Sequence, residues 1–472
     1  MELLQQESLF KALKNQLEGE ILYDDLTKAI YATDASVYRK IPQAVAYPKT
    51  IQDIQLLIAF ANKNNTSLIP RTAGTSLAGQ CVGNGIVVDV SKYFTKILKV
   101  NKSAKTVTVQ PGVIRDELNH YLKPFGLFFG PNTSTSNRCM IGGMVGNNSS
   151  GTTSIQYGVT RDKVLELHTV LSDGSLTVFN EVTNEAFQNK TKQNNLEGQI
   201  YKTIYSELAS EAVQNEIKKQ FPKPEIHRRN TGYAIDELIK AEIFSSSTSN
   251  FNMCQLLSGS EGTLAFTTQI TLQLDVLPPT ESMMIALHFH TIEACLNTVE
   301  TVMKHQLHTC EMMDKTILDL TKHNKTQQIN RQFIKGDPEA ILMCEIKGDA
   351  ITDVENQAAL LIKDIDKLGL SYANVKLKAK DINKAMELRK AGLGLLGNMI
   401  GDKKTAACIE DTAVTLPDLA NYIADFTKLM ASYNQNAVYY AHAGAGELHL
   451  RPILNLKKKE KLKSWTKSLK KI

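Results

Sequence analysis

The stretch Pro70-Arg71-Thr72-Ala73-Gly74-Thr75-Ser76-Leu77-Ala78-Gly79-Gln80 opens the part of the sequence that decides the fold. Two similar stretches follow at 130–136 and 141–151, and Tyr157-Gly158 comes shortly after them. Glycines let backbone N–H groups approach an anion closely, and Ser and Thr hydroxyls add further donors. Three such loops in one domain predict a long phosphorylated ligand rather than a single phosphate.

These loops resemble the PCMH-type FAD-binding domain of the vanillyl-alcohol oxidase flavoprotein family. Within that family they are most similar to the D-lactate and D-2-hydroxyglutarate dehydrogenase branch, which includes the FAD subunit of glycolate oxidase. The segment 259–265, Gly-Ser-Glu-Gly-Thr-Leu-Ala, matches the family's second flavin-contacting motif. The resemblance extends from about residue 44 to 456 and rests on several motifs in the family's order.

The resemblance implies an α+β chain in four parts. These are a helical lead-in at 1–40, a two-part FAD-binding domain at 41–275, a substrate (cap) domain with an antiparallel sheet at 276–455, and a basic amphipathic tail at 456–472. It also implies noncovalent FAD, because His120 and His168 lie in apparent helix and strand contexts rather than in the loops. The implied FAD-binding residues are Pro70, Arg71, Thr72, Ala73, Gly74, Thr75, Ser76, Gln80, Pro131, Asn132, Ser136, Gly142, Gly143, Asn147, Ser150, Gly151, Tyr157, Gly158, Glu261 and Gly262.

Composition narrows the class of protein. A chain of 472 residues is too long for one ordinary core. It has no apolar run of membrane-spanning length and no signal-peptide pattern, and its seven scattered cysteines indicate reduced thiols in a cytoplasmic protein. The net charge of +5 comes from the tail: 457–472 holds eight Lys and one Glu, a net of +7, which leaves 5 − 7 = −2. Nucleic-acid binding therefore has no support outside that tail.

Local patterns predict elements that alternate between helix and strand. A helix begins after Thr50 with a capping-box-like start, and the segments 67–70, 85–90, 105–110, 283–289 and 340–346 read as strands. The loop 230–233 resembles one that the family places near the flavin. The polar segment 187–199 predicts an exposed loop or insertion.

The segment 392–397, Gly-Leu-Gly-Leu-Leu-Gly, matches the dinucleotide pattern GxGxxG. That fingerprint needs a preceding strand, whereas 381–390 is charged and helical in character, so we reject a nicotinamide site. Arg389 lies just before it. By spacing alone Arg389 is a surface residue of an amphipathic helix, but the resemblance implies that it binds the substrate carboxylate. A guanidinium fork suits a carboxylate bidentately.

The segment 437–451 is the second strong signal. If 443–446 forms a hairpin loop, His442 pairs with Glu447, and period-two geometry places His442, Glu447, His449 and Arg451 on one face. Two imidazoles beside a carboxylate favour a divalent metal such as zinc, manganese or iron. A polar strand face with structural histidines is the alternative. The family's metal motif, a His followed seven residues later by another His across a Gly-rich turn, supports the metal.

This chain departs from the family's pattern in two places. Ala445-Gly446-Glu447 stands where the family commonly has Asp-Gly-Asn, and Arg451 replaces an Asn. The family's later Ser-Gly-Glu-His-Gly motif, with a further metal ligand and the base, does not occur before Ile472. We therefore expect the chain to be an incomplete catalytic unit. Its tail predicts an amphipathic helix, either on a membrane surface or against a partner further downstream.

The resulting hypothesis is an FAD-linked dehydrogenase that oxidises the CH–OH group of a D-2-hydroxy acid. Its site residues would be Arg389, His449 and Arg451, with the metal on His442, Glu447 and His449. Electrons would pass to a quinone, a flavoprotein or an iron–sulfur partner, in a cytoplasmic or peripheral inner-membrane protein, as a homodimer. The alternatives are a metal-independent sugar or alcohol oxidase on the same fold, and a flavin electron-transfer subunit of a larger iron–sulfur complex.

Overall fold

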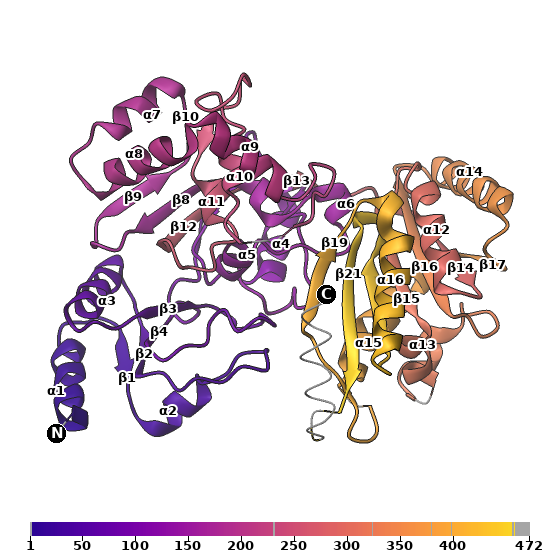
Figure 1. The fold of residues 1–472 in the computed structure, drawn as a ribbon, viewed down its shortest axis with the longest axis horizontal. Helices are drawn as coiled ribbons and strands as arrows, with labels where there is room; N and C mark the ends of the chain where they lie inside the picture. Colours follow the sequence, from indigo (N-terminus) through magenta and orange to yellow (C-terminus); the bar gives the residue numbers. More distant parts are fainter. Residues whose placement is uncertain are drawn as a thin grey trace. The chain divides into compact units, whose positions relative to one another are not determined.

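The computed structural model describes residues 2–229, 232–322, 324–378, 380–397, 399–455 and 457 (Figure 1). The chain forms two compact units, each built from more than one segment. The first unit comprises Met1–Ser150, Val159–Pro222 and Asn230–Leu277, and the second comprises Gly151–Gly158, Lys223–Arg229 and Pro278–Ile472. Two short segments from the first half of the sequence thus belong to the second unit. The predicted tail helix lies outside the described residues.

The first unit begins with a small mixed sheet in the order β1-β2-β4-β3, in which the β2–β4 and β4–β3 pairs are parallel. Its elements are α1 (Glu2–Lys14), β1 (Glu20–Leu22), α2 (Asp25–Ile30), β2 (Ala44–Tyr47), α3 (Ile51–Lys63), β3 (Leu68–Arg71) and β4 (Ile86–Asp89). Helix α3 starts where predicted: Thr50 and Asp53 form a capping box, and Ile54 and Leu57 are fully buried. β3 ends at the first Gly-rich loop.

A five-stranded antiparallel sheet, ordered β5-β6-β12-β8-β9, carries the rest of the first unit. The strands are β5 (Ile97–Asn101), β6 (Thr106–Val109), β8 (Val164–Val170), β9 (Leu176–Phe179) and β12 (Phe266–Gln273). Short pairs join β7 (Leu127–Phe128) to β13 (Asp275–Val276) and β10 (Glu181–Val182) to β11 (Phe251–Asn252). The helices are α4 (Arg115–Leu122), α5 (Ile141–Asn147), α7 (Asn184–Thr191), α8 (Leu196–Leu208), α9 (Glu211–Gln220), α10 (Ile235–Leu238) and α11 (Cys254–Leu257). The strands predicted at 67–70, 85–90 and 105–110 correspond to β3, β4 and β6.

The prediction of an exposed loop at 187–199 is wrong. The segment lies in α7 and the start of α8, with a short turn between them. Phe187 is fully buried, and its ring packs edge-on against Tyr201 and Phe251. Polar composition concealed two amphipathic helices that bury Phe187, Tyr201 and Leu208 on the side that faces the core.

The second unit is built on one large antiparallel sheet ordered β17-β14-β16-β15-β20-β21-β18, with β19 also paired to β21. The strands are β14 (Glu281–Phe289), β15 (Thr309–Asp314), β16 (Ala340–Gly348), β17 (Ala373–Lys378), β18 (Lys404–Thr405), β19 (Ile409–Ala413), β20 (Ala437–His442) and β21 (Glu447–Leu454). The helices are α6 (Ser154–Tyr157), α12 (Ile292–Val302), α13 (Lys315–Lys322), α14 (Ile351–Leu368), α15 (Lys380–Leu396) and α16 (Leu419–Ser432). Both units match the predicted α+β class, and the predicted strands at 283–289 and 340–346 are β14 and β16.

Helices cover both faces of this sheet (Figure 1). One core joins the sheet to α12, α14 and α16, and a second, smaller core joins the opposite face to α13 and α15. Alternation along β20 places Ala437, Tyr439 and Ala441 in the first core, and Val438 and Tyr440 in the second. The candidate polar residues therefore lie on the face that α13 and α15 cover.

Candidate functional site

The Gly-rich loops of the first unit meet one another closely. A Cβ built on Gly143 in α5 would lie 2.6 Å from the Thr72 Oγ1 atom of the first loop. The side-chain amide of Gln80 donates to Asn147 Oδ1 at 2.9 Å, and Asn147 in turn donates to Ser149 Oγ at 3.0 Å. Side chains of the first loop thus contact α5 and the turn that follows it. Gly74 and Gly79 turn the first loop with positive φ angles of 63° and 75°.

The second motif packs on the same helix. The Glu261 N–H donates to the Gly146 carbonyl at 2.8 Å, and the Gly259 N–H donates to the Val145 carbonyl at 2.9 Å. A Cβ on Gly262 would approach Pro70 Cγ at 3.1 Å. Three segments far apart in the sequence therefore form one Gly-, Ser- and Thr-rich surface of the kind that suits a pyrophosphate.

The remaining predicted flavin residues occupy two further places. The loop with Pro131, Asn132 and Ser136 is fastened to α4: Arg115 donates to the Pro131 carbonyl at 3.1 Å, and Ser136 Oγ donates to Asp116 Oδ2 at 3.0 Å. Ser150 ends a segment of the first unit, whereas Gly151, Tyr157 and Gly158 fall in the second unit.

There the Tyr157 ring meets His308 edge-on, with 5.6 Å between ring centroids. Residues 230 and 231 of the loop predicted near the flavin lie outside the described residues. The Tyr233 hydroxyl that follows them is 2.7 Å from Thr263 Oγ1 of the second motif.

In the second unit, the predicted hairpin at 437–451 has the predicted register. His442 pairs with Glu447, and Tyr440 pairs with His449. A 3-10 turn at Ala443–Ala445 and Gly446, with φ +66°, close the loop. His442 and His449 lie with ring centroids 5.2 Å apart. The alternation of polar residues was enough to predict this juxtaposition.

Among the described residues, His442, Glu447 and His449 form one group that could hold a metal ion. One ligand atom from each lies within 4.8 Å of the others. His442 Nδ1 faces the carboxylate of Glu311 at 2.9 Å, and His449 Nδ1 faces Asp411 at 3.2 Å. Because the Nδ1 atom of each ring faces a carboxylate, the Nε2 atom remains available to bind a metal. A carboxylate on the far nitrogen is the usual arrangement of metal-binding histidines. The donor set of two imidazoles and one carboxylate fits a divalent transition metal.

Arg389 comes from α15 and lies against this hairpin. It forms an ion pair with Glu311, donates to the Ala441 carbonyl at 3.3 Å, and stacks over the Tyr440 ring at 4.1 Å. Its side chain is almost fully buried, and its Nε atom has no hydrogen-bond partner among the described residues. The GxGxxG segment lies at the C-terminal end of α15, so a helix and not a strand leads directly into it, which agrees with the rejection of a nicotinamide site.

Sequence reasoning missed three polar members of the cluster. Arg228 forms a buried ion pair with Glu447, Glu311 lies within β15, and Asp411 belongs to β19. One signal was available for Glu311: the sequence places this carboxylate between the apolar residues Cys310 and Met312. Arg451, on β21, is also buried.

Burial governs the titration of the cluster. Burial raises the pKa of Glu311 to about 7, although the charges of Arg389 and Arg228 oppose the shift. Burial likewise raises the pKa of Glu447 to about 8, against the nearby Arg228. Burial, then the charges of Arg228 and Arg389, holds the pKa of His442 well below its usual value, so this imidazole is neutral and able to bind a metal.

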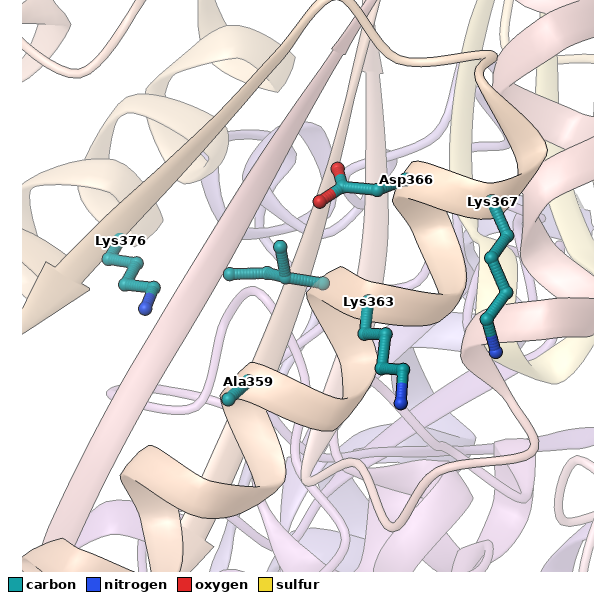
Figure 2. Close-up of a pocket in the computed structure, with 6 residues that line it drawn as sticks. Ala359, Lys363, Asp366, Lys367 and Lys376 are labelled. Carbon is teal, nitrogen blue, oxygen red and sulfur yellow. The ribbon is translucent and has the colours of Figure 1, made fainter.

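A surface hollow of about 530 Å³ lies elsewhere on the second unit, over α14 and β17 (Figure 2). Its lining is Ala359, Ile362, Lys363, Asp366, Lys367 and Lys376, and it includes none of the predicted site residues. Lys376 lies on the edge strand β17, where a lysine discourages pairing with another sheet.

Within the part of the chain that the structure describes, no helix has the length and apolar character needed to cross a membrane. All seven cysteines fall in that part, none of them forms a disulfide there, and six of them are buried.

Comparison with known proteins agrees with the architecture. Residues 42–180 match the FAD binding domain, and residues 278–472 match the C-terminal domain of FAD linked oxidases. The chain is 32% identical to D-2-hydroxyglutarate dehydrogenase of Haemophilus influenzae over 94% of its own length, and it spans 44% of that relative. It is 24% identical to glycolate oxidase subunit GlcD of Bacillus subtilis, covering 95% of this chain and 81% of the relative.

Solved structures share the fold. An alkyldihydroxyacetonephosphate synthase superposes with a TM-score of 0.67 at 14% identity, over 98% of this chain and 79% of the synthase. The chain therefore carries an FAD binding domain followed by the C-terminal domain of FAD linked oxidases.

Proposed function

We propose that this chain is the flavin-dependent catalytic part of a dehydrogenase that oxidises a D-2-hydroxy acid to the 2-oxo acid. The observation that carries the proposal is the buried cluster of His442, Glu447 and His449 beside Arg389. A buried donor without a partner costs about 1–3 kcal/mol, and a substrate carboxylate on the Nε atom of Arg389 would offset that cost. The relatives named D-2-hydroxyglutarate dehydrogenase and D-lactate dehydrogenase support the same substrate class.

Each group of residues has a distinct role in this proposal. Arg389 holds the carboxylate next to the reacting carbon, and Arg451 adds positive charge on the same face. His442, Glu447 and His449 would hold a divalent metal (zinc, manganese or iron), whose chemistry when bound is to polarise the substrate hydroxyl. The loops around Gly74, Gly143 and Glu261 would hold FAD, which supplies the acceptor for the hydride.

Charge favours a dicarboxylate over D-lactate. The cluster holds three guanidinium groups (Arg228, Arg389 and Arg451) and three carboxyl groups (Glu311, Asp411 and Glu447). Leaving the histidines out of the count, its formal charge is 3 − 3 = 0 with every carboxyl ionised, and protonation of Glu311 or Glu447, whose pKa values burial raises to about 7 and about 8, makes it positive. A bound divalent cation would add +2, which a dianion neutralises better than a monoanion does. We therefore propose the D-2-hydroxyglutarate class as the preferred substrate.

Further parts of the proposal rest on the family and on composition. Free cysteines favour a reducing, cytoplasmic location, with peripheral attachment to the inner membrane as a second arrangement. A quinone, a flavoprotein or an iron–sulfur protein would accept the electrons, and we propose a homodimer as the oligomeric state.

One observation favours a second function. Arg228 already neutralises Glu447, so the cluster can form without a metal ion. That arrangement suits a metal-independent sugar or alcohol oxidase on the same fold. Metal analysis of the purified, active protein separates the two: an active protein without bound metal supports the oxidase and contradicts the dehydrogenase.

The deciding experiment is anaerobic flavin reduction, screened over D- and L-2-hydroxy acids. We expect D-2-hydroxyglutarate to bleach the flavin fastest, D-lactate to act more slowly, and the L-acids to have no effect. Arg389→Gln, with unchanged flavin content, should slow bleaching by every acid. If no hydroxy acid reduces the flavin of the wild-type protein, the proposal is wrong and an electron-transfer subunit becomes the better assignment.

A further inference from the structure

Glu311 is a carboxylate at the centre of the large sheet of the second unit. It lies on β15 with its side chain 1% exposed, between strands β16 and β20. The neighbouring residues Cys310 and Met312 are equally buried and apolar. A buried carboxylate is costly unless it is paired and hydrogen-bonded, so its contacts indicate why it is tolerated there.

One contact of Glu311 goes to a candidate metal ligand. Both carboxylate oxygens lie 2.9 Å from the Nδ1 atom of His442. In its ionised form, which the ion pair with Arg389 favours, the Glu311 carboxylate only accepts hydrogen bonds. In that form Nδ1 carries the proton, and Nε2 keeps the lone pair that a metal would need. A carboxylate behind a histidine in this way fixes the ring's tautomer and orientation and raises its basicity.

The other contact goes to the candidate substrate arginine. Glu311 forms an ion pair with Arg389, whose guanidinium also donates to the Ala441 carbonyl at 3.3 Å and lies 4.1 Å over the Tyr440 ring. These contacts hold Arg389 on several sides while its Nε atom has no hydrogen-bond partner among the described residues. The guanidinium is therefore fixed in orientation before any ligand arrives.

We infer that Glu311 is a positioning residue that joins the two halves of the site. One carboxylate sets the tautomer of His442 and the orientation of Arg389, so metal affinity and the orientation of the substrate carboxylate depend on the same side chain. This inference rests on the proposed function. It adds a residue that touches neither the substrate nor the metal.

The two halves should respond to its loss in opposite directions. Without the carboxylate, His442 becomes a weaker ligand, and metal affinity should fall by about 10–100-fold. Arg389 loses a competing anion, so a bound dicarboxylate should not be held more weakly. The guanidinium of Arg389 also loses its fixed orientation, so kcat should fall while KM stays unchanged or decreases. A residue with a merely structural role would not produce that split.

The matched variants are Glu311→Gln, which is isosteric, Glu311→Ala, and the control Glu345→Gln. Glu345 is a buried glutamate on the neighbouring strand β16, where it contacts Thr309 and Lys347. The full-length flavoprotein is used throughout. Zinc affinity is measured by competition with a chelator, and 2-oxoglutarate affinity is measured by calorimetry. The ¹⁵N signals of labelled histidine, assigned with His442→Gln, report the tautomer in metal-free protein.

We expect zinc affinity to fall at least tenfold in Glu311→Ala and by less in Glu311→Gln, because a glutamine oxygen still accepts from Nδ1–H. We expect 2-oxoglutarate affinity to be unchanged or tighter, and Glu345→Gln to change neither quantity. Zinc affinity within twofold of wild type in both Glu311 variants overturns the inference, as does an equal loss in Glu345→Gln. If the wild-type protein binds no zinc, the metal part of the proposed function fails, and the ¹⁵N signals of His442 then test the positioning role alone. A His442 Nδ1–H tautomer that is present in wild type and lost in Glu311→Ala supports that role. The same tautomer in both proteins refutes it.

Discussion

Gly446→Ala should destabilise the second unit, because the turn that joins β20 to β21 has no room for the added Cβ atom. Gly446 has φ +66°, and a Cβ there would collide with the backbone carbonyl oxygen of Val414. An L-residue in the left-handed region costs about 1–2 kcal/mol. Overpacking against atoms that cannot move away typically costs about 1–3 kcal/mol more. We therefore expect the free energy of unfolding to fall by about 2–5 kcal/mol.

The chain offers a control that separates the two costs. Gly369 caps the C-terminus of α14 with φ +62°, and no described atom lies within 4 Å of a Cβ built there. Gly369→Ala should therefore show the conformational cost alone, about 1–2 kcal/mol. Urea denaturation followed by circular dichroism gives both values. Zinc affinity should fall in Gly446→Ala, because the turn sets the pairing of His442 with Glu447, and should not change in Gly369→Ala.

Equal destabilisation by the two substitutions would refute this reasoning. It would mean that the Val414 segment moves aside freely and that the turn does not fix the hairpin. Unchanged zinc affinity in a strongly destabilised Gly446→Ala would refute the second half, because the metal ligands would then be positioned without the turn.

Three further predictions concern the flavin, the substrate and pH. Gly143→Val and Gly74→Val should each abolish flavin binding with a modest change in far-UV circular dichroism; normal flavin content in both variants would show that these loops do not hold the cofactor. Arg389→Lys keeps the positive charge but loses the two parallel N–H donors of the guanidinium, so turnover should fall about 10–100-fold while flavin content stays unchanged. Wild-type kinetics in this variant would mean that Arg389 has only a structural role. Burial raises the pKa of Asp314 from 3.8 to about 7, so its contribution to stability is fully present below pH 3.8 and is lost as the pH rises through 7. Asp314→Asn should flatten that fall in unfolding free energy between pH 4 and 7, and an unchanged slope would contradict the shift.

The sequence predicted those features that depend on neighbours along the chain. The capping box at Thr50, the strands that deliver the first loop, and the pairing of His442 with Glu447 all follow from local periodicity and turn chemistry. The family resemblance supplied the fold class. Composition alone misread 187–199, although Thr183 and Asn195 cap the two helices there by accepting from the Ala186 and Gly198 N–H groups.

The missed residues depend on long-range pairing. Glu311 reaches the site because β15 pairs with β20, so that Met312 lies opposite Ala441 and Met313 opposite Tyr440. No periodicity within either strand reveals that neighbour. Arg228 belongs to a short segment that has no regular secondary structure, so no sequence pattern associates it with Glu447.

The discontinuity of the second unit affects how the site can assemble during synthesis. Arg228 leaves the ribosome long before Glu447. Its guanidinium therefore has no buried partner until most of the C-terminal half of the chain has been synthesised. Until β21 is made, the Lys223–Arg229 segment cannot take its final place, and β21 produced alone would bury Glu447 without a counter-ion. Cutting the chain between Arg229 and the start of the second matched domain at residue 278 should therefore yield a C-terminal fragment with a defective site. A division of this protein for expression has to keep that segment together with the hairpin.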